Sequence, residues 1–303
     1  MRKFIGLTQR NLLVFFKDKT MIFFSMLTPL IIFVLYLLFL RDTYVNALEE
    51  SAGILLPLIH GSDVDAFVNG LLLSGIMGSS LITIPYNCLV TLISDREAGI
   101  DVDLTVTPAS RLQIILAYFT AAAISAFLMT SIIMGIGLFL LQLTASTFLT
   151  VKAVLKLMLL LFIGSVSSTA IFMLIVLFIK TTSASGAFLG ILSAVSGFII
   201  GAYIPLSGFA SAIRNLCQMF PATGITVLLR DTLLSGVLDH VNDSIVGIDQ
   251  GLFTSGIRNY FTFQIEFFGN AFSWQQTCFY VIMITMAAIL AISLIYPKVY
   301  QKK

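Results

Sequence analysis

Charged residues are scarce in this chain of 303 residues. Only 11% of the side chains are Asp, Glu, Lys or Arg and 58% are hydrophobic, so the chain is far more apolar than a soluble domain. A core of this length cannot enclose so much apolar surface, and we expect lipid to cover it. With 17 Lys and Arg against 15 Asp and Glu, the chain has no domain-wide basic field, so we expect no nucleic-acid partner.

Cysteine and histidine are also few. Cys88, Cys217 and Cys278 are odd in number and fit no metal-binding spacing, so a disulfide framework is not expected. His60 and His240 are isolated in the sequence, without a cluster of cysteine or carboxylate ligands beside them. The sequence therefore predicts no metal site.

Motifs for nucleotide hydrolysis and catalysis are missing as well. No glycine is followed by lysine, so the phosphate-binding loop G-x-x-x-x-G-K-[ST] does not occur. The H-E-x-x-H and G-x-S-x-G motifs are absent too. We therefore expect no catalytic residue and no cofactor bound by this chain.

Long hydrophobic runs, in contrast, are abundant. A helix needs about 20 apolar residues to cross the hydrocarbon core of a membrane. Six runs without any charged residue predict spans at 21–40, 66–93, 112–141, 157–179, 181–206 and 273–297. The fold class expected over residues 1–303 is therefore all-α, a single integral membrane domain with six transmembrane helices. Because ion-driven carriers usually place ionisable residues inside their spans, the runs disfavour a proton- or sodium-coupled carrier.

The basic residues are distributed unevenly around these spans. Most of the Lys and Arg fall in the short segments 1–20, 94–111 and 298–303 and at Lys180. All four lie on one side of the membrane if six spans alternate in direction. Because basic residues in short loops gather on the cytoplasmic side, we expect a multi-pass protein of the cell membrane with both termini in the cytoplasm.

The first 20 residues predict an amphipathic interfacial helix. On a helical wheel, Arg2, Lys3, Arg10 and Lys17 lie opposite an apolar face that includes Phe4. Such a helix would lie along the inner leaflet with its cations near lipid phosphates. A plain cytoplasmic lead-in to the first span is the alternative.

Residues 207–266 predict an outer segment between the fifth and sixth spans. Its charge-free run 215–229 is too short to cross a membrane, and Pro221 and Gly224 interrupt it. This run predicts a re-entrant or interfacial segment, whose amides must be satisfied by protein or water. The more polar stretch 237–250 predicts a surface excursion.

The inner loop 94–111 is the most unusual segment of the chain. It holds six charged residues between two spans that have none. Topological pressure explains its basic residues but not its acidic ones. The stretch from Glu97 to Val106 predicts a short surface helix, which Pro108 would end, and Ser110 is placed to cap the next span.

This loop resembles that of permeases of the type-2 ATP-binding-cassette (ABC-2) exporter family, such as bacterial drug, lipid and polyketide exporters. The matching residues are Arg96, Glu97, Gly99, Leu104, Thr107, Pro108, Ser110 and Arg111. The chain departs from the family at Ile100 and Val102, where threonine and glutamate are common. Residues 219–224, followed by Arg230, partly match a second family pattern.

The resemblance implies a division of labour between two kinds of subunit. The loop would dock onto a cytoplasmic ABC ATPase subunit, which uses ATP and Mg, and this permease would pair with a second one as a homodimer or heterodimer. The residues expected to couple to the ATPase are Arg96, Glu97, Gly99, Asp101, Asp103, Thr107, Pro108 and Arg111.

The fifth span carries a strip of small residues that permits close helix approach. Its glycines are Gly186, Gly190, Gly197 and Gly201. Ordinary packing inside one subunit, a dimer seam and the substrate path all remain open for this strip. Uncharged polar groups among many Phe and Met side chains suit an amphipathic or lipid-like substrate for efflux, such as a drug, lipid, polyketide or peptide.

An alternative function is a membrane-embedded lipid-modifying enzyme or scaffold subunit. Such an enzyme needs ionisable residues at the membrane interface, and Asp231 with Arg230 or His240 are the candidates. No base and orienting group stand at a recognisable spacing among them.

Overall fold

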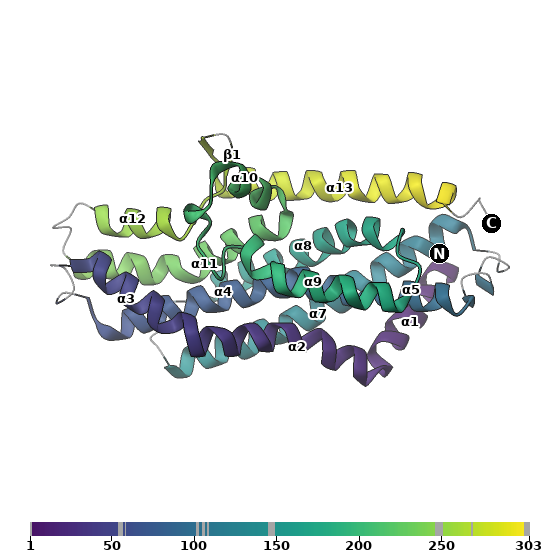
Figure 1. The fold of residues 1–303 in the computed structure, drawn as a ribbon, viewed down its shortest axis with the longest axis horizontal. Coiled ribbons are helices and arrows are strands. Elements are labelled where there is room, and N and C mark those ends of the chain that lie inside the picture. Colours follow the sequence, from purple (N-terminus) through teal and green to yellow (C-terminus); the bar gives the residue numbers. More distant parts are fainter. Residues whose placement is uncertain are drawn as a thin grey trace.

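The computed structural model describes residues 2–53, 57, 59–100, 103–104, 107, 109–144, 149–245, 251–267 and 269–299. In this part the chain is an elongated bundle of helices with one short antiparallel hairpin, β1 (Glu266–Phe267) and β2 (Asn270–Ala271) (Figure 1). Helix α1 (Arg2–Lys17) and the last turns of α13 (Trp274–Val299) lie at the same end of the bundle. We call this the termini end, and the opposite one the far end.

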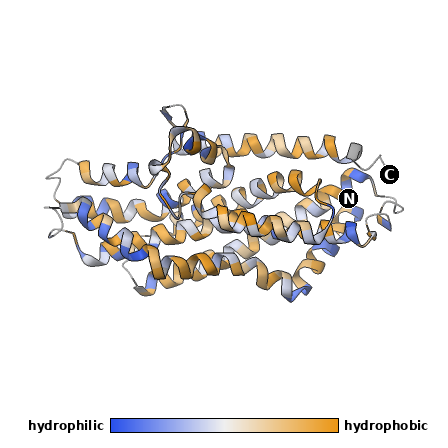
Figure 2. Ribbon diagram, in the orientation of Figure 1, coloured by the Kyte–Doolittle hydropathy of each residue, from blue (hydrophilic) through white to orange (hydrophobic). Residues whose placement is uncertain are grey.

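In the described part of the chain, six helical stretches are long and apolar enough to cross a membrane. They are Lys19–Glu50, Gly61–Glu97, Arg111–Leu143, Val151–Val176, Thr182–Ile199 and Trp274–Tyr296. Hydrophobic residues dominate their length, and hydrophilic residues gather toward the two ends of the bundle (Figure 2). The prediction of an all-α integral membrane protein with six spans is confirmed.

The first two spans are each built from consecutive helical segments. The first comprises α2 (Lys19–Leu35), a π-helical turn η1 (Tyr36–Leu40) and α3 (Arg41–Ala52). The second comprises α4 (Gly61–Cys88) and α5 (Val90–Glu97). The other spans are α7 (Arg111–Thr144), α8 (Val151–Val176), α9 (Thr182–Ile199) and α13. The first helix thus continues well past residue 40, where the charge-free run ends.

The fifth span is shorter than predicted. Helix α9 ends at Ile199, not at residue 206, because the chain turns back there. Gly201 adopts a φ of 69°, which favours glycine, and the amides of Ala202 and Tyr203 both donate to the carbonyl of Gly197, at 2.8 and 3.2 Å. The short 3₁₀ turn η3 (Leu206–Gly208) follows.

The segment after η3 is largely helical and partly buried. It contains α10 (Ser211–Met219), α11 (Pro221–Ser244) and α12 (Leu252–Tyr260). Pro221 occupies the first turn of α11, where its missing amide costs nothing, so it begins a helix instead of interrupting one. Val237, Leu238 and Val241 are buried, so the surface excursion predicted for 237–250 is wrong up to Ser244, and 246–250 lie outside the described residues.

Helix α4 forms the centre of the bundle. In its most apolar window 89% of the residues are buried, against 17% for α9. Helices α2, α7, α8, α9 and α11 pack around it. The approach of α11 is close, because a Cβ at Gly78 would collide with the side chain of Thr226. The peripheral helices α2, α9 and α13 expose apolar faces, which lipid or a second subunit can cover.

Candidate functional site

The described residues of the loop 94–111 lie at the termini end, from the last residues of α5 to the start of α7 (Figure 1). Helix α5 extends the second span down to Glu97, where Gly99 ends it with a φ of 77°. The predicted helix from Glu97 to Val106 is therefore wrong at its start. Asp101, Pro108 and residues 102, 105 and 106 lie outside the described residues.

Asp95 fastens the start of this loop to two other helices. Its carboxylate accepts from both terminal nitrogens of Arg10 in α1, the Nη2–Oδ1 distance being 3.0 Å, and from the hydroxyl of Tyr118 in α7. Asp95 and Tyr118 are 5% and 4% exposed. The hydrogen bond from Arg10 to Asp95 raises the pKa of the guanidinium although burial lowers it. The three groups form a charge-assisted junction in which Asp95 and Tyr118 are buried and Arg10 is partly exposed.

The helical wheel predicts that Arg10 faces lipid phosphates. In the structure Arg10 is instead bonded to Asp95. Helix α1 forms over Arg2–Lys17 and packs mainly against α7, with Thr8, Asn11 and Phe15 buried. The polar side of α1 is thus partly an intramolecular contact surface.

Arg96 and Glu97, which follow Asp95, form hydrogen bonds with the turn between α8 and α9. Nη1 of Arg96 donates to the carbonyls of Leu177 and Ile179, at 3.2 and 2.8 Å, beyond the C-terminal end of α8. Oε2 of Glu97 accepts from the amide of Thr182 at 2.8 Å, at the first residue of α9. A cation at a helix C-terminus and an anion at an N-terminus both complement the helix dipole. Arg96 and Glu97 thus join the loop to the fourth and fifth spans.

The remaining predicted coupling residues are either more exposed or form hydrogen bonds within local turns. The hydroxyl of Thr107 donates to the carbonyl of Leu104 at 2.6 Å, and Asp103 and Arg111 are exposed. The prediction that Ser110 caps the third span is confirmed: its hydroxyl accepts from the amide of Gln113 at 3.3 Å, and its own amide donates to the Gln113 side chain at 3.1 Å.

The glycines of the fifth span do not form one continuous strip. A Cβ at Gly186 or Gly190 would meet nothing within 4 Å, so their side of α9 is open. A Cβ at Gly197 would collide with the ring of Tyr203, and Gly201 lies beyond the helix end. Gly197 and Gly201 therefore serve the turn after α9, which corrects their placement on a helix-packing face.

The side chains expected for a membrane enzyme do not assemble. Arg230 is 1% exposed and donates to the backbone carbonyls of Phe261 and Thr262. Asp231 instead accepts from Arg258 at 3.1 Å. His240 lies further along α11, and its Nδ1 is 3.1 Å from Oδ2 of Asp63.

The proximity of His240 to Asp63 was not predicted from the sequence. Nδ1 of His60 also lies 3.9 Å from the same carboxylate oxygen, and the two imidazole rings are 6.3 Å apart. Among the described residues no group of three His, Cys, Asp or Glu side chains is arranged to hold a metal ion.

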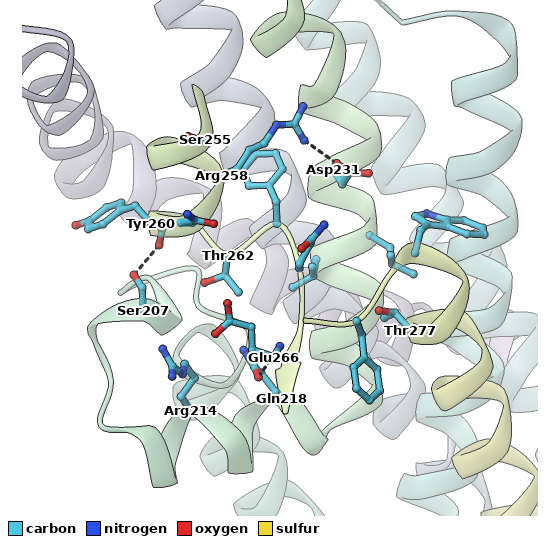
Figure 3. A pocket seen from close by; sticks show the side chains of 17 residues that line it. Ser207, Arg214, Gln218, Asp231, Ser255, Arg258, Tyr260, Thr262, Glu266 and Thr277 are labelled. Atoms are coloured by element: carbon cyan, nitrogen blue, oxygen red, sulfur yellow. Dashed lines mark hydrogen bonds and ion pairs between the residues drawn. The ribbon is translucent and has the colours of Figure 1, made fainter. Parts of the chain in front are cut away.

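The described part of the bundle contains an apolar cavity and a polar one. One of about 580 Å³ lies between α2, α4 and α7 and is lined almost entirely by apolar side chains such as Phe23, Leu72 and Ile133. The other, of about 670 Å³, lies among α10, α11, α12 and the start of α13 and is rich in polar groups (Figure 3).

Comparison with known proteins gives one match. A family model described as ABC-2 type transporter matches residues 2–234, which include the loop 94–111 and the first five spans. No curated protein and no solved structure matches the chain.

Proposed function

The chain belongs to the ABC-2 type transporter family and is the transmembrane subunit of an ABC transporter, and from this premise we propose that it works as an exporter. A separate cytoplasmic ATPase subunit drives it with ATP and Mg, and the complex moves an amphipathic or lipid-like substrate out of the cell. Both termini and the loop 94–111 then face the cytoplasm, in agreement with the distribution of basic residues.

The attachment of the loop 94–111 supports its role in coupling. Through Asp95, Arg96 and Glu97 the loop contacts α1, α7, the end of α8 and the start of α9. A displacement applied to the loop by an ATPase subunit is therefore transmitted to several helices together. Asp103, which is exposed, is free to contact the partner, whereas Arg96 and Glu97 position the loop.

The apolar cavity between α2, α4 and α7 supports the substrate class. Phe23, Met26 and Phe33 of α2 face Leu72, Leu73 and other aliphatic side chains across it. Transfer of an acyl chain or aromatic ring from water into such a cavity is favourable. Transfer of a small ion is unfavourable, because the ion loses its hydration. The cavity therefore favours an amphipathic molecule.

The open side of α9 supports association with a second permease. Gly186 and Gly190 permit a neighbouring helix to approach its backbone closely, and the described part of this chain leaves that position vacant. A homodimer and a heterodimer both satisfy this requirement.

Co-purification tests the proposal most simply. Tagged chain is isolated in mild detergent from cells that also produce the candidate ATPase subunit, and we expect the two to elute together with ATPase activity. Asp103→Lys should weaken the association, whereas Ser62→Lys, an exposed position at the far end, should leave it unchanged. Export in cells that lack any ATPase partner would contradict the proposal.

A further inference from the structure

The polar cavity contains Arg214, which forms no ion pair with the described carboxylates, although Glu266 lines the same cavity. Among the described residues Arg214 forms no ion pair, and its Nε has no hydrogen-bond partner. The other arginine of the cavity, Arg258, is engaged by Asp231 at 3.1 Å and Asp239 at 3.7 Å. Because a partly buried guanidinium without an anion is costly, Arg214 is available for an anionic ligand.

The surroundings of Arg214 provide further contacts for such a ligand. Figure 3 shows Arg214 and Gln218 of α10 on one wall with Glu266, and Asp231 with Arg258 across the cavity. Oε1 of Gln218 accepts from the amide of Glu266 at 3.2 Å, which fixes the side-chain amide in place. Lys156 lies 4.5 Å above the ring of Trp274, a lining residue, and is a third cation near the cavity after Arg214 and Arg258.

The cavity lies at the level where lipid headgroups are expected. Trp274 is the first residue of the sixth span and lines the cavity, and tryptophan is enriched at the boundary between membrane and water. This position suits a ligand whose polar group occupies the cavity and whose apolar part extends into the membrane.

We propose that this cavity binds the phosphate or carboxylate group of an anionic amphipathic molecule, with Arg214 as its principal counter-ion. The inference deepens the proposed function, on which it rests, by naming an anionic headgroup as the class of cargo. A lipid of the surrounding membrane carries the same chemistry and is the other source of the ligand.

Trp274 makes the binding measurable, because it is the only tryptophan of the chain. The purified chain, without any ATPase subunit, is titrated with dioctanoyl phosphatidylglycerol while tryptophan emission is recorded. We expect a saturable change, and at least about tenfold weaker binding of dioctanoyl phosphatidylcholine, which has no net charge.

Variants assign the binding to Arg214. Arg214→Gln should raise the midpoint of the titration, the lipid concentration at half-saturation, by about tenfold. Arg214→Lys keeps the charge and should raise this midpoint less. Glu266→Gln removes a repelling charge and should lower the midpoint by about threefold. Lys152→Gln removes one charge from an exposed position of α8 and should not change it. An unchanged midpoint in Arg214→Gln, or equal binding of the two lipids, would overturn the proposal.

Two further measurements identify the source of the ligand. Saturation by glycerol 1-phosphate alone shows that the headgroup suffices, and saturation only by the lipid shows that the tail contributes; both results support the anion site. If phosphatidylglycerol stimulates ATP hydrolysis in the full complex, the bound ligand is cargo. If it binds without stimulating hydrolysis, the bound ligand is a lipid of the surrounding membrane. If the chain binds the lipid but never an ATPase subunit, the proposed function fails and the anion site remains.

Discussion

Arg10 and Arg96 at the termini end differ from Arg214 of the polar cavity in how they are engaged, although Arg258 of the same cavity is paired with Asp231. At the termini end, Arg10 and Arg96 are engaged by Asp95 and by backbone carbonyls. In the polar cavity toward the far end, Arg214 has no carboxylate partner among the described residues. Charges that are satisfied within the chain hold helices together, whereas an unsatisfied charge is available to a ligand. The comparison predicts large losses of stability at the first kind of position and loss of binding at the second.

Asp95→Ala should cause the largest loss of stability. It leaves the guanidinium of Arg10 and the buried hydroxyl of Tyr118 without their shared acceptor, and breaking a pair whose carboxylate is buried costs up to about 3 kcal/mol. Thermal unfolding in detergent should show a clearly lower Tm. Asp103→Ala removes a charge from an exposed position and serves as the control; equal Tm values for both variants would contradict the junction.

Arg230→Met should destabilise the chain next most strongly. The substitution leaves the buried carbonyls of Phe261 and Thr262 without a donor, at a cost of about 2 kcal/mol. The half-exposed pair of Arg258 with Asp231 offers a comparison, because Arg258→Met should cost less than about 1 kcal/mol. If Arg258→Met lowers the Tm as much as Arg230→Met, burial of Arg230 does not increase its contribution to stability.

Arg96→Gln should have a smaller effect on stability and a distinct effect on coupling. Loss of a cation at the end of α8 costs about 1 kcal/mol. Because the loop is then less firmly joined to the fourth span, ATP hydrolysis in the reconstituted complex should continue while export falls. Lys19→Gln, at an exposed position, is the control, and export that stays proportional to hydrolysis would argue against transmission through Arg96.

Arg214→Gln should have the smallest effect on stability. No ion pair among the described residues is lost, so the free energy of unfolding should change by no more than about 0.5 kcal/mol and the Tm should stay close to that of the unchanged chain. A Tm decrease as large as that of Asp95→Ala would show that Arg214 is structural. The comparison between the two ends would then fail.

The sequence alone predicts the spans well, because membrane crossing requires long apolar runs that are visible locally. It also predicts the cap at Ser110, which depends on a residue only three positions away. The sequence places the end of α9 too late, because residues 200–206 are uncharged although they form a turn that Gly201 permits.

The junctions between distant segments were not predictable in the same way. Arg10 and Asp95 are 85 positions apart, and Asp63 and His240 are 177 apart, so no local pattern relates them. The burial of Arg230 is equally non-local, since its acceptors belong to the segment after α12. Asp101 and Pro108, which the family resemblance selects, lie outside the described residues, and their coupling role stays a prediction.

Site-directed labelling tests the proposed coupling most directly. In a chain whose three cysteines are replaced by alanine, Asp103→Cys and Ser62→Cys are compared with a membrane-impermeant maleimide in intact cells, and then by cross-linking to the ATPase subunit. We predict that the cysteine at position 62 is labelled from outside, whereas the one at position 103 is protected and cross-links to the ATPase. Labelling of position 103 from outside, with no cross-link, would contradict the proposal.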